Sequence, residues 1–74
     1  MAFDFMKLRG KIREICGTEK AFSELMEWSE RTTSLKLNSK IPWKQNEIMK
    51  AINILHLSEG DIPLYFFTKK VQSY

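Results

Sequence analysis

The side chains that most often carry catalysis are sparse in this sequence. No histidine or second cysteine accompanies Cys16, and His56 stands in a stretch dominated by Ile and Leu. Metal sites need several such ligands close together, and nucleophilic catalysis needs a nucleophile with an adjacent base. The three glycines are too scattered for a phosphate-binding loop. We therefore expect no enzyme, no catalytic residue, no metal, no cofactor and no small-molecule substrate.

Hydrogen-bonding side chains gather instead between Thr18 and Lys40. Residues 30–38 are polar along nearly their whole length, with Leu35 and Leu37 as the large apolar exceptions. A packed helix in a small protein is seldom so polar unless most of its surface faces water or a charged partner. Such side chains suit base edges and phosphates, which is typical of a recognition helix. An ordinary solvent-exposed helix would have the same composition.

The net charge of +3 comes from one segment of the chain. Residues 29–50 hold five basic side chains against two acidic ones, whereas residues 1–28 and 51–74 each balance to zero. A local basic surface attracts phosphate better than the same charge spread thinly. The alternative is a basic face that only contacts solvent.

The polar segment needs a scaffold, and the apolar spacing predicts one made of short helices. Asp4, Thr18 and Ser29 are the expected N-caps of the first three helices, and Gly17 is expected to end the first. Ser58 and Asp61 resemble a capping box, and Pro63 is expected to end or kink the short turn that follows. The residues expected to face the core are Phe5, Leu8, Ile12, Ile15, Phe22, Leu25, Met26, Ile48, Ala51, Ile52 and Leu55.

These elements predict an all-α fold, a compact bundle of four to five short helices in one domain, residues 1–74, with a polar tail at about 68–74. Alternation is weak and no strand pair is expected. A single cysteine leaves the fold to rest on packing alone, which suits a reducing compartment. No apolar run approaches the roughly 20 residues of a membrane span, and no signal peptide is evident. We expect a cytoplasmic protein that does not bind membranes.

The stretch "GTEKAFSELMEWSERTTSLKLNSKIPWKQNEIMKAINILHLSEGDIPLYFF" resembles the Cro/CI-type helix-turn-helix superfamily. It is most similar to small phage and prophage regulators (DUF739-like, Cro-like) with a "G-T-Q-K-x-F-A-x-x-L-G-I-S-E-R-T-L-S-x-K-L-N-x-K" core. The likeness extends over roughly residues 3–72. It implies a lambda-repressor-like bundle with its helix-turn-helix motif at about 18–38.

Four positions depart from the family pattern. Ser23 replaces an alanine, Thr33 replaces an Ile or Leu, and Lys44 replaces a capping threonine. Glu27 replaces the turn glycine, where a left-handed backbone would cost roughly 1 kcal/mol or more. We expect Leu37 and Trp28 to compensate for the weaker anchor at Thr33.

The resemblance also implies the roles of individual residues on DNA. Arg31 would read guanine, Glu30 would accept a hydrogen bond from cytosine, and Leu35 would touch a thymine methyl group. Helix N-termini and the following loop would contact phosphate. The base-facing residues expected are Ser29, Glu30, Arg31, Ser34 and Leu35. The phosphate-facing residues expected are Thr18, Glu19, Lys20, Asn38, Lys40 and Lys44.

The function expected first is that of a Cro-like repressor of a phage lysogeny switch, a sequence-specific regulator bound to a double-stranded DNA operator. One such helix contacts few base pairs, so a homodimer is expected, with the surface at Leu64, Tyr65, Phe66 and Phe67. Core closure is the alternative role of these four residues. The alternative function is an antirepressor, a modulator of repression that binds a partner phage repressor, with acidic Glu30 in the protein contact.

Overall fold

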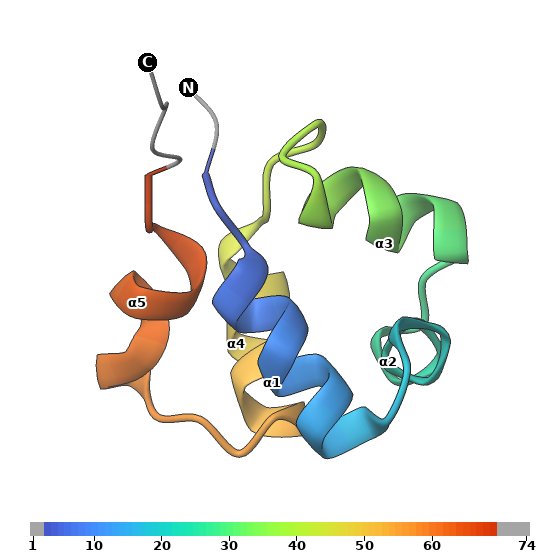
Figure 1. Cartoon of the computed structure of the whole chain (residues 1–74), viewed down its shortest axis with the longest axis horizontal. Helices are drawn as coiled ribbons and strands as arrows, with labels where there is room; N and C mark the ends of the chain where they lie inside the picture. Colours follow the sequence, from blue (N-terminus) through green and yellow to red (C-terminus); the bar gives the residue numbers. More distant parts are fainter. Residues whose placement is uncertain (1–2, 70–74) are drawn as a thin grey trace.

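The computed structural model describes residues 3–69, which form five α-helices and a short 3-10 helix (Figure 1). In chain order these are α1 (Met6–Cys16), α2 (Glu19–Met26), α3 (Glu30–Leu37), α4 (Gln45–Ile54), η1 (Glu59–Asp61) and α5 (Ile62–Phe66). Within residues 3–69 the only strand-like pairing is one antiparallel bridge between Phe3 and Lys69. The predicted all-α bundle is confirmed, while most of the predicted polar tail lies outside the described residues.

Two of the predicted caps begin the helices that matter most here. The Thr18 hydroxyl oxygen accepts the backbone N–H of Ala21 at 3.0 Å, so α2 begins at the residue after Thr18. The Ser29 hydroxyl oxygen accepts the N–H of Thr32 at 3.1 Å and begins α3 in the same way. Both hydroxyls satisfy amide groups that a helix cannot satisfy internally. The two helices are therefore separated by a turn of only three residues, 27–29.

Two other boundaries differ from the prediction. Asp4 accepts the N–H of Met6 at 2.8 Å, but it does so one residue ahead of the cap position, and α1 begins at Met6. Pro63 was expected to end a turn, yet it occupies the second position of α5. A proline is tolerated there because first-turn amides lack intrahelical partners in any case. The predicted Ser58–Asp61 contact is present, with the Ser58 N–H donating to the Asp61 carboxylate at 3.0 Å.

Most of the predicted core is buried, and two predicted members are not. Leu25 is 53% exposed and Ile15 is 38% exposed. Ser23 is buried, and its hydroxyl donates to the Thr33 hydroxyl of α3 at 2.6 Å. α2 thus meets α3 on its Ser23 side, while Leu25 faces outward. The buried apolar residues are Phe5, Leu8, Ile12, Phe22, Met26, Leu37, Ile48, Ala51, Ile52, Leu55 and Phe66.

Trp43 joins the segment after α3 to the rest of the fold. Its ring lies 5.2 Å from the Trp28 ring, 5.0 Å from the Phe66 ring and 6.2 Å from the Phe5 ring, measured between centroids. The Trp28 and Phe66 rings meet Trp43 edge-to-face, and such pairs stabilise the fold beyond the area that the rings bury. The residues between α3 and α4 are therefore anchored to α1, to the turn before α3 and to α5. No helix within residues 3–69 is both long and apolar enough to cross a membrane.

Three of the helices are each followed by a residue that has a left-handed backbone and is not glycine. Glu27, Ser39 and His56 have φ angles of 61°, 61° and 57° and follow α2, α3 and α4. Such positions usually hold glycine, because a Cβ atom is strained there. Glu27 thus has the left-handed conformation considered for it above. The left-handed conformations of Ser39 and His56 were not predicted from the sequence. The predicted Gly17 ends α1 with φ of 88°.

We expect His56→Gly to stabilise the protein. His56 is exposed, and its N–H and that of Leu57 close α4 by donating to the carbonyls of Asn53 and Ile52 at 3.3 and 2.8 Å. Glycine would keep both bonds and relieve the Cβ strain, so the free energy of unfolding should rise by about 1 kcal/mol. Urea unfolding measures the change. His56→Ala is the control, since it keeps Cβ; an equal gain in both variants would contradict the backbone explanation.

Candidate interaction face on α2 and α3

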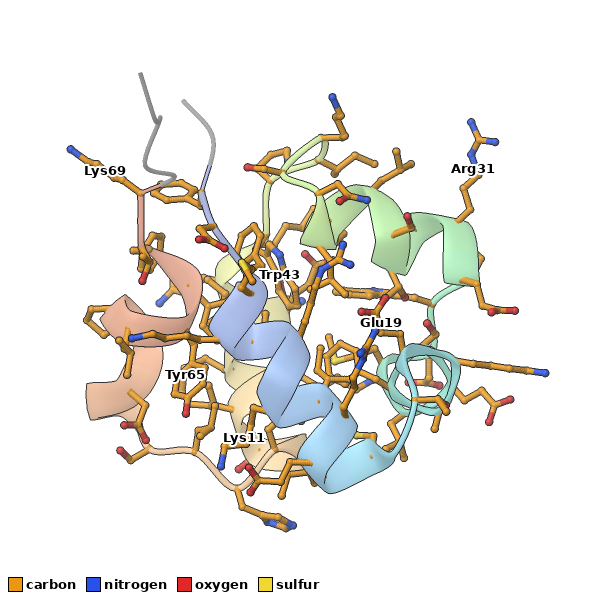
Figure 2. The ribbon with its side chains drawn as sticks, in the orientation of Figure 1. Lys11, Glu19, Arg31, Trp43, Tyr65 and Lys69 are labelled. Carbon is orange, nitrogen blue, oxygen red and sulfur yellow. The ribbon has the colours of Figure 1, made fainter. Side chains whose placement is uncertain are left out.

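Five exposed or half-exposed side chains on α2 and α3 form one outer surface, which we call the α2–α3 face. It consists of Glu19, Lys20, Glu30, Arg31 and Ser34. A hollow of about 250 Å³ lies between the two helices and is lined by Glu19, Lys20, Ser23, Glu30, Thr33 and Ser34. Figure 2 shows Arg31 pointing away from the body of the protein, while Glu19 lies on the side of α2 nearest α3.

At each of these two helix N-termini, one backbone amide is capped by a side chain of the chain itself. The Thr18 and Ser29 hydroxyls accept backbone amides, and Ser29 also donates to the Thr32 hydroxyl at 3.0 Å. The first residue of each helix is a glutamate, Glu19 in α2 and Glu30 in α3. A carboxylate in the first turn is stabilised by the helix dipole. These two carboxylates therefore lie where a phosphate would approach, with Glu30 exposed and Glu19 half-buried.

Arg9 of α1 belongs to this surface, although the sequence did not single it out. Its guanidinium donates to the Asn38 side-chain oxygen at 3.0 Å and lies 3.5 Å from the Glu19 carboxylate. That Glu19 oxygen is buried and makes no hydrogen bond. Asn38 in turn donates to the Ser34 hydroxyl at 3.3 Å. Arg9 thus links α1 to the start of α2 and to the end of α3. The sequence offered one signal for Arg9. It follows Phe5 by four residues, and residues four apart lie on the same side of a helix.

The basic segment is less basic at the surface than its composition indicates. Lys36 is buried and its ammonium lies 2.6 Å from the Glu47 carboxylate of α4. Lys50 pairs with Glu27 at 2.9 Å. Two of the five basic side chains in residues 29–50 are therefore neutralised by carboxylates. The three that remain exposed are Arg31, Lys40 and Lys44.

The remaining site residues are split between the face and the segment after it. Asn38, Lys40 and Lys44 are exposed and lie at or beyond the end of α3, whereas Leu35 is half-buried. The Leu35 carbonyl accepts the N–H of Lys40 at 2.8 Å, which folds this segment back on α3. The structure therefore brings Glu19, Lys20, Glu30 and Ser34 together around the hollow, with Arg31 next to Glu30 and pointing away from the protein. It leaves Lys40 and Lys44 on an adjoining loop.

The Glu47 carboxyl has a pKa below its ordinary value of 4.5. Burial raises this pKa, but hydrogen bonds from the Lys36 ammonium and the Lys44 N–H, together with both lysine charges, outweigh it. A carboxyl with a lowered pKa in the folded state binds protons more tightly when unfolded. The stabilisation that the ionised Glu47 carboxyl gives to the folded state is present above its ordinary pKa. It is lost as the pH falls through the pKa that this carboxyl has in the folded state.

We therefore expect the free energy of unfolding to fall as the pH drops below about 4.5. Urea midpoints between pH 7 and pH 3 measure this dependence. The control is Glu47→Gln, which cannot ionise and should flatten the profile in this range. An unchanged pH dependence in that variant would show that other carboxyl groups account for the effect.

The four residues predicted as a dimer or partner surface do not share one environment. Leu64 and Phe67 are 45% and 50% exposed, and Tyr65 is half-buried. Phe66 is 2% exposed and packs on Trp43, so its assignment to an outer surface is wrong. Its ring is needed to close the core, which was the alternative role considered for it. Leu64 of α5 and Phe67, which directly follows the helix, remain a predicted contact surface.

The sequence and the structure were compared with known proteins. The family model described as "Protein of unknown function (DUF739)" matches residues 1–69. No curated protein matches the chain. Among solved structures, the chain is similar to the modulator of repression (MOR) of the temperate bacteriophage TP901-1 from Lactococcus lactis. The two are 53% identical, 97% of each chain is covered, and the TM-score is 0.81. The chain is thus similar over nearly its whole length to a phage regulatory protein.

Proposed function

The chain belongs to the DUF739 family, and from that premise we propose that it is a modulator of phage repression that binds a repressor protein through its α2–α3 face. Support comes first from the bacteriophage relative, which is 53% identical over almost the full length and is described as a modulator of repression. A protein that modulates repression can act on the repressor or on its operator. The surface chemistry of the α2–α3 face favours the first route.

The observation that carries the proposal is the exposed carboxylate of Glu30 at the N-terminus of α3. It lines the hollow between α2 and α3 together with Glu19, whose carboxylate is paired with Arg9. Phosphate binding at a helix N-terminus uses free amide groups and the positive end of the dipole. Here the start of α3 carries the exposed Glu30 carboxylate, which would repel a DNA phosphate. Basic side chains of a partner protein would instead find complementary charge.

The distribution of cations supports the same conclusion. Binding of duplex DNA depends on several lysines and arginines that neutralise phosphates. Lys36 and Lys50, which would otherwise add to such a surface, are engaged by Glu47 and Glu27. The exposed hydroxyl, amide and mixed-sign charged groups that remain are suited to a polar protein contact, in which charge complementarity gives specificity.

DNA binding without a partner is the second candidate, and exposed Arg31, Lys40 and Lys44 are the observation in its favour. In that case Arg31 would enter the major groove and the two lysines would contact phosphate. This candidate makes a definite prediction: Arg31→Ala should weaken operator binding by about 1–3 kcal/mol.

A mobility-shift experiment separates the two candidates. The chain is mixed with intergenic DNA from beside its gene, with and without the co-encoded repressor. We expect no shift by the chain alone and an altered repressor–DNA complex when both proteins are present. A shift by the chain alone that weakens steeply as salt rises would contradict the proposal and favour DNA binding.

A further inference from the structure

The buried side of α3 is mostly polar. Its buried residues are Thr33, Lys36 and Leu37, so only Leu37 provides apolar packing. By contrast, α4 buries Ile48, Ala51 and Ile52. Apolar burial is non-directional, and a helix held by one leucine has little to fix its orientation. The orientation of α3 must therefore depend on directional polar contacts.

One of those contacts is the hydrogen bond from Ser23 of α2 to Thr33 at 2.6 Å, and Lys36 makes most of the others. Its side chain is 5% exposed, and its ammonium donates to the Glu47 carboxylate at 2.6 Å and to the Pro42 carbonyl at 3.2 Å. The same ammonium lies 5.1 Å from the centroid of the Trp28 ring, within the range of a cation–π contact. The backbone carbonyl of Lys36 also accepts the indole N–H of Trp43 at 3.3 Å. One residue thus joins α3 to α4, to the turn before α3 and to the segment after it.

A buried ion pair of this kind contributes orientation more readily than stability. Removing two charges from water is costly, and apolar residues of similar volume often replace a buried pair with little or no loss of stability. An apolar pair, however, does not require one particular geometry. Glu47 adds to the directional requirement because its carboxylate also accepts the N–H of Lys44 at 2.8 Å, which fixes the start of α4.

We infer that the Lys36–Glu47 pair is the positioning element of the α2–α3 face, which sets the orientation in which α3 presents Glu30, Arg31 and Ser34. Lys36 is a positioning residue and not a contact residue, because it is buried. The consequence for a partner rests on the proposed function, whereas the effect on α3 itself does not.

The test replaces the pair with apolar residues of similar size, Lys36→Met together with Glu47→Leu. The chain offers a matched control in its other Lys–Glu pair between α4 and the α2–α3 region, the exposed contact of Lys50 with Glu27. The control variant is Lys50→Met with Glu27→Gln. Amide hydrogen exchange of α3 and α4 and the amide chemical shifts are compared in both variants and the parent.

We expect the Lys36/Glu47 variant to fold, with α3 amides exchanging about tenfold faster or more while the core amides of α4 keep their protection. Chemical shifts should move in α3 and in residues 38–44, and the control should show neither change. If the apolar variant does not fold, Lys36→Gln with Glu47→Gln is measured against the same criterion. Unchanged exchange and shifts in α3 would overturn the inference.

The co-encoded repressor provides a separate readout. A folded apolar variant with a loosened α3 should bind the repressor about tenfold more weakly or worse, and the control variant should bind like the parent. If the parent itself does not bind the repressor, the proposed function fails. The exchange result still decides whether Lys36 positions α3.

Discussion

Phe22→Ala is expected to remove a large share of the stability of the fold. Phe22 is fully buried on α2, and its ring meets the Trp28 ring edge-on at 6.4 Å. Truncation of a buried phenylalanine costs about 3–5 kcal/mol, because apolar area is lost and a cavity is left. A domain of this length has roughly 4–11 kcal/mol in total. Urea unfolding followed by tryptophan fluorescence measures the loss.

The control lies three residues further along the same helix. Leu25 is 53% exposed and was predicted from the sequence to be in the core. Leu25→Ala should change the free energy of unfolding by about 0.5 kcal/mol or less, as is usual for surface positions. Equal losses in the two variants would mean that α2 presents a different side to the core from the one described.

Charge reversal at Glu30 is expected to have the largest effect on binding. If basic side chains of a repressor meet the α2–α3 face, Glu30→Lys places like charges together at that contact. Affinity for the co-encoded repressor should fall about tenfold or more, which corresponds to at least about 1.4 kcal/mol. The same variant should bind duplex DNA more tightly, since one carboxylate is replaced by a cation. Titration calorimetry and mobility shifts measure the two affinities.

Glu59→Lys is the matched control for this reversal. Glu59 is exposed and is the first residue of η1, just as Glu30 is the first residue of α3. Figure 1 places η1 beside α5, on the other side of the molecule from α3. Both variants change the net charge equally, so an equal loss of repressor affinity would indicate a general electrostatic effect and would count against the α2–α3 face.

The parts of the fold that the sequence predicted are those set by neighbouring residues. Thr18 and Ser29 cap their helices through contacts three residues away, which a local pattern reveals. The stripe of Ile48, Ala51 and Ile52 follows from helical periodicity in the same way. The short polar α3 was also evident, because so few of its residues are apolar.

The parts that were missed depend on distant residues or on exceptions to residue preference. Arg9 reaches Asn38 across 29 residues, a contact that no local pattern contains. Lys36 was counted with the basic surface because lysine is rarely buried, and its partner Glu47 lies on another helix. Leu25 faces outward while Ser23 packs against Thr33 of α3, and this arrangement depends on how the two helices pack.

Chemical-shift mapping of the repressor contact tests the central claim most directly. The isotope-labelled chain is titrated with the unlabelled co-encoded repressor, and the amide shifts are followed. The account predicts that the largest shifts fall on Glu19, Lys20, Glu30, Arg31 and Ser34. Shifts centred instead on Leu64 and Phe67 at the end of α5, or no shifts at all, would contradict it.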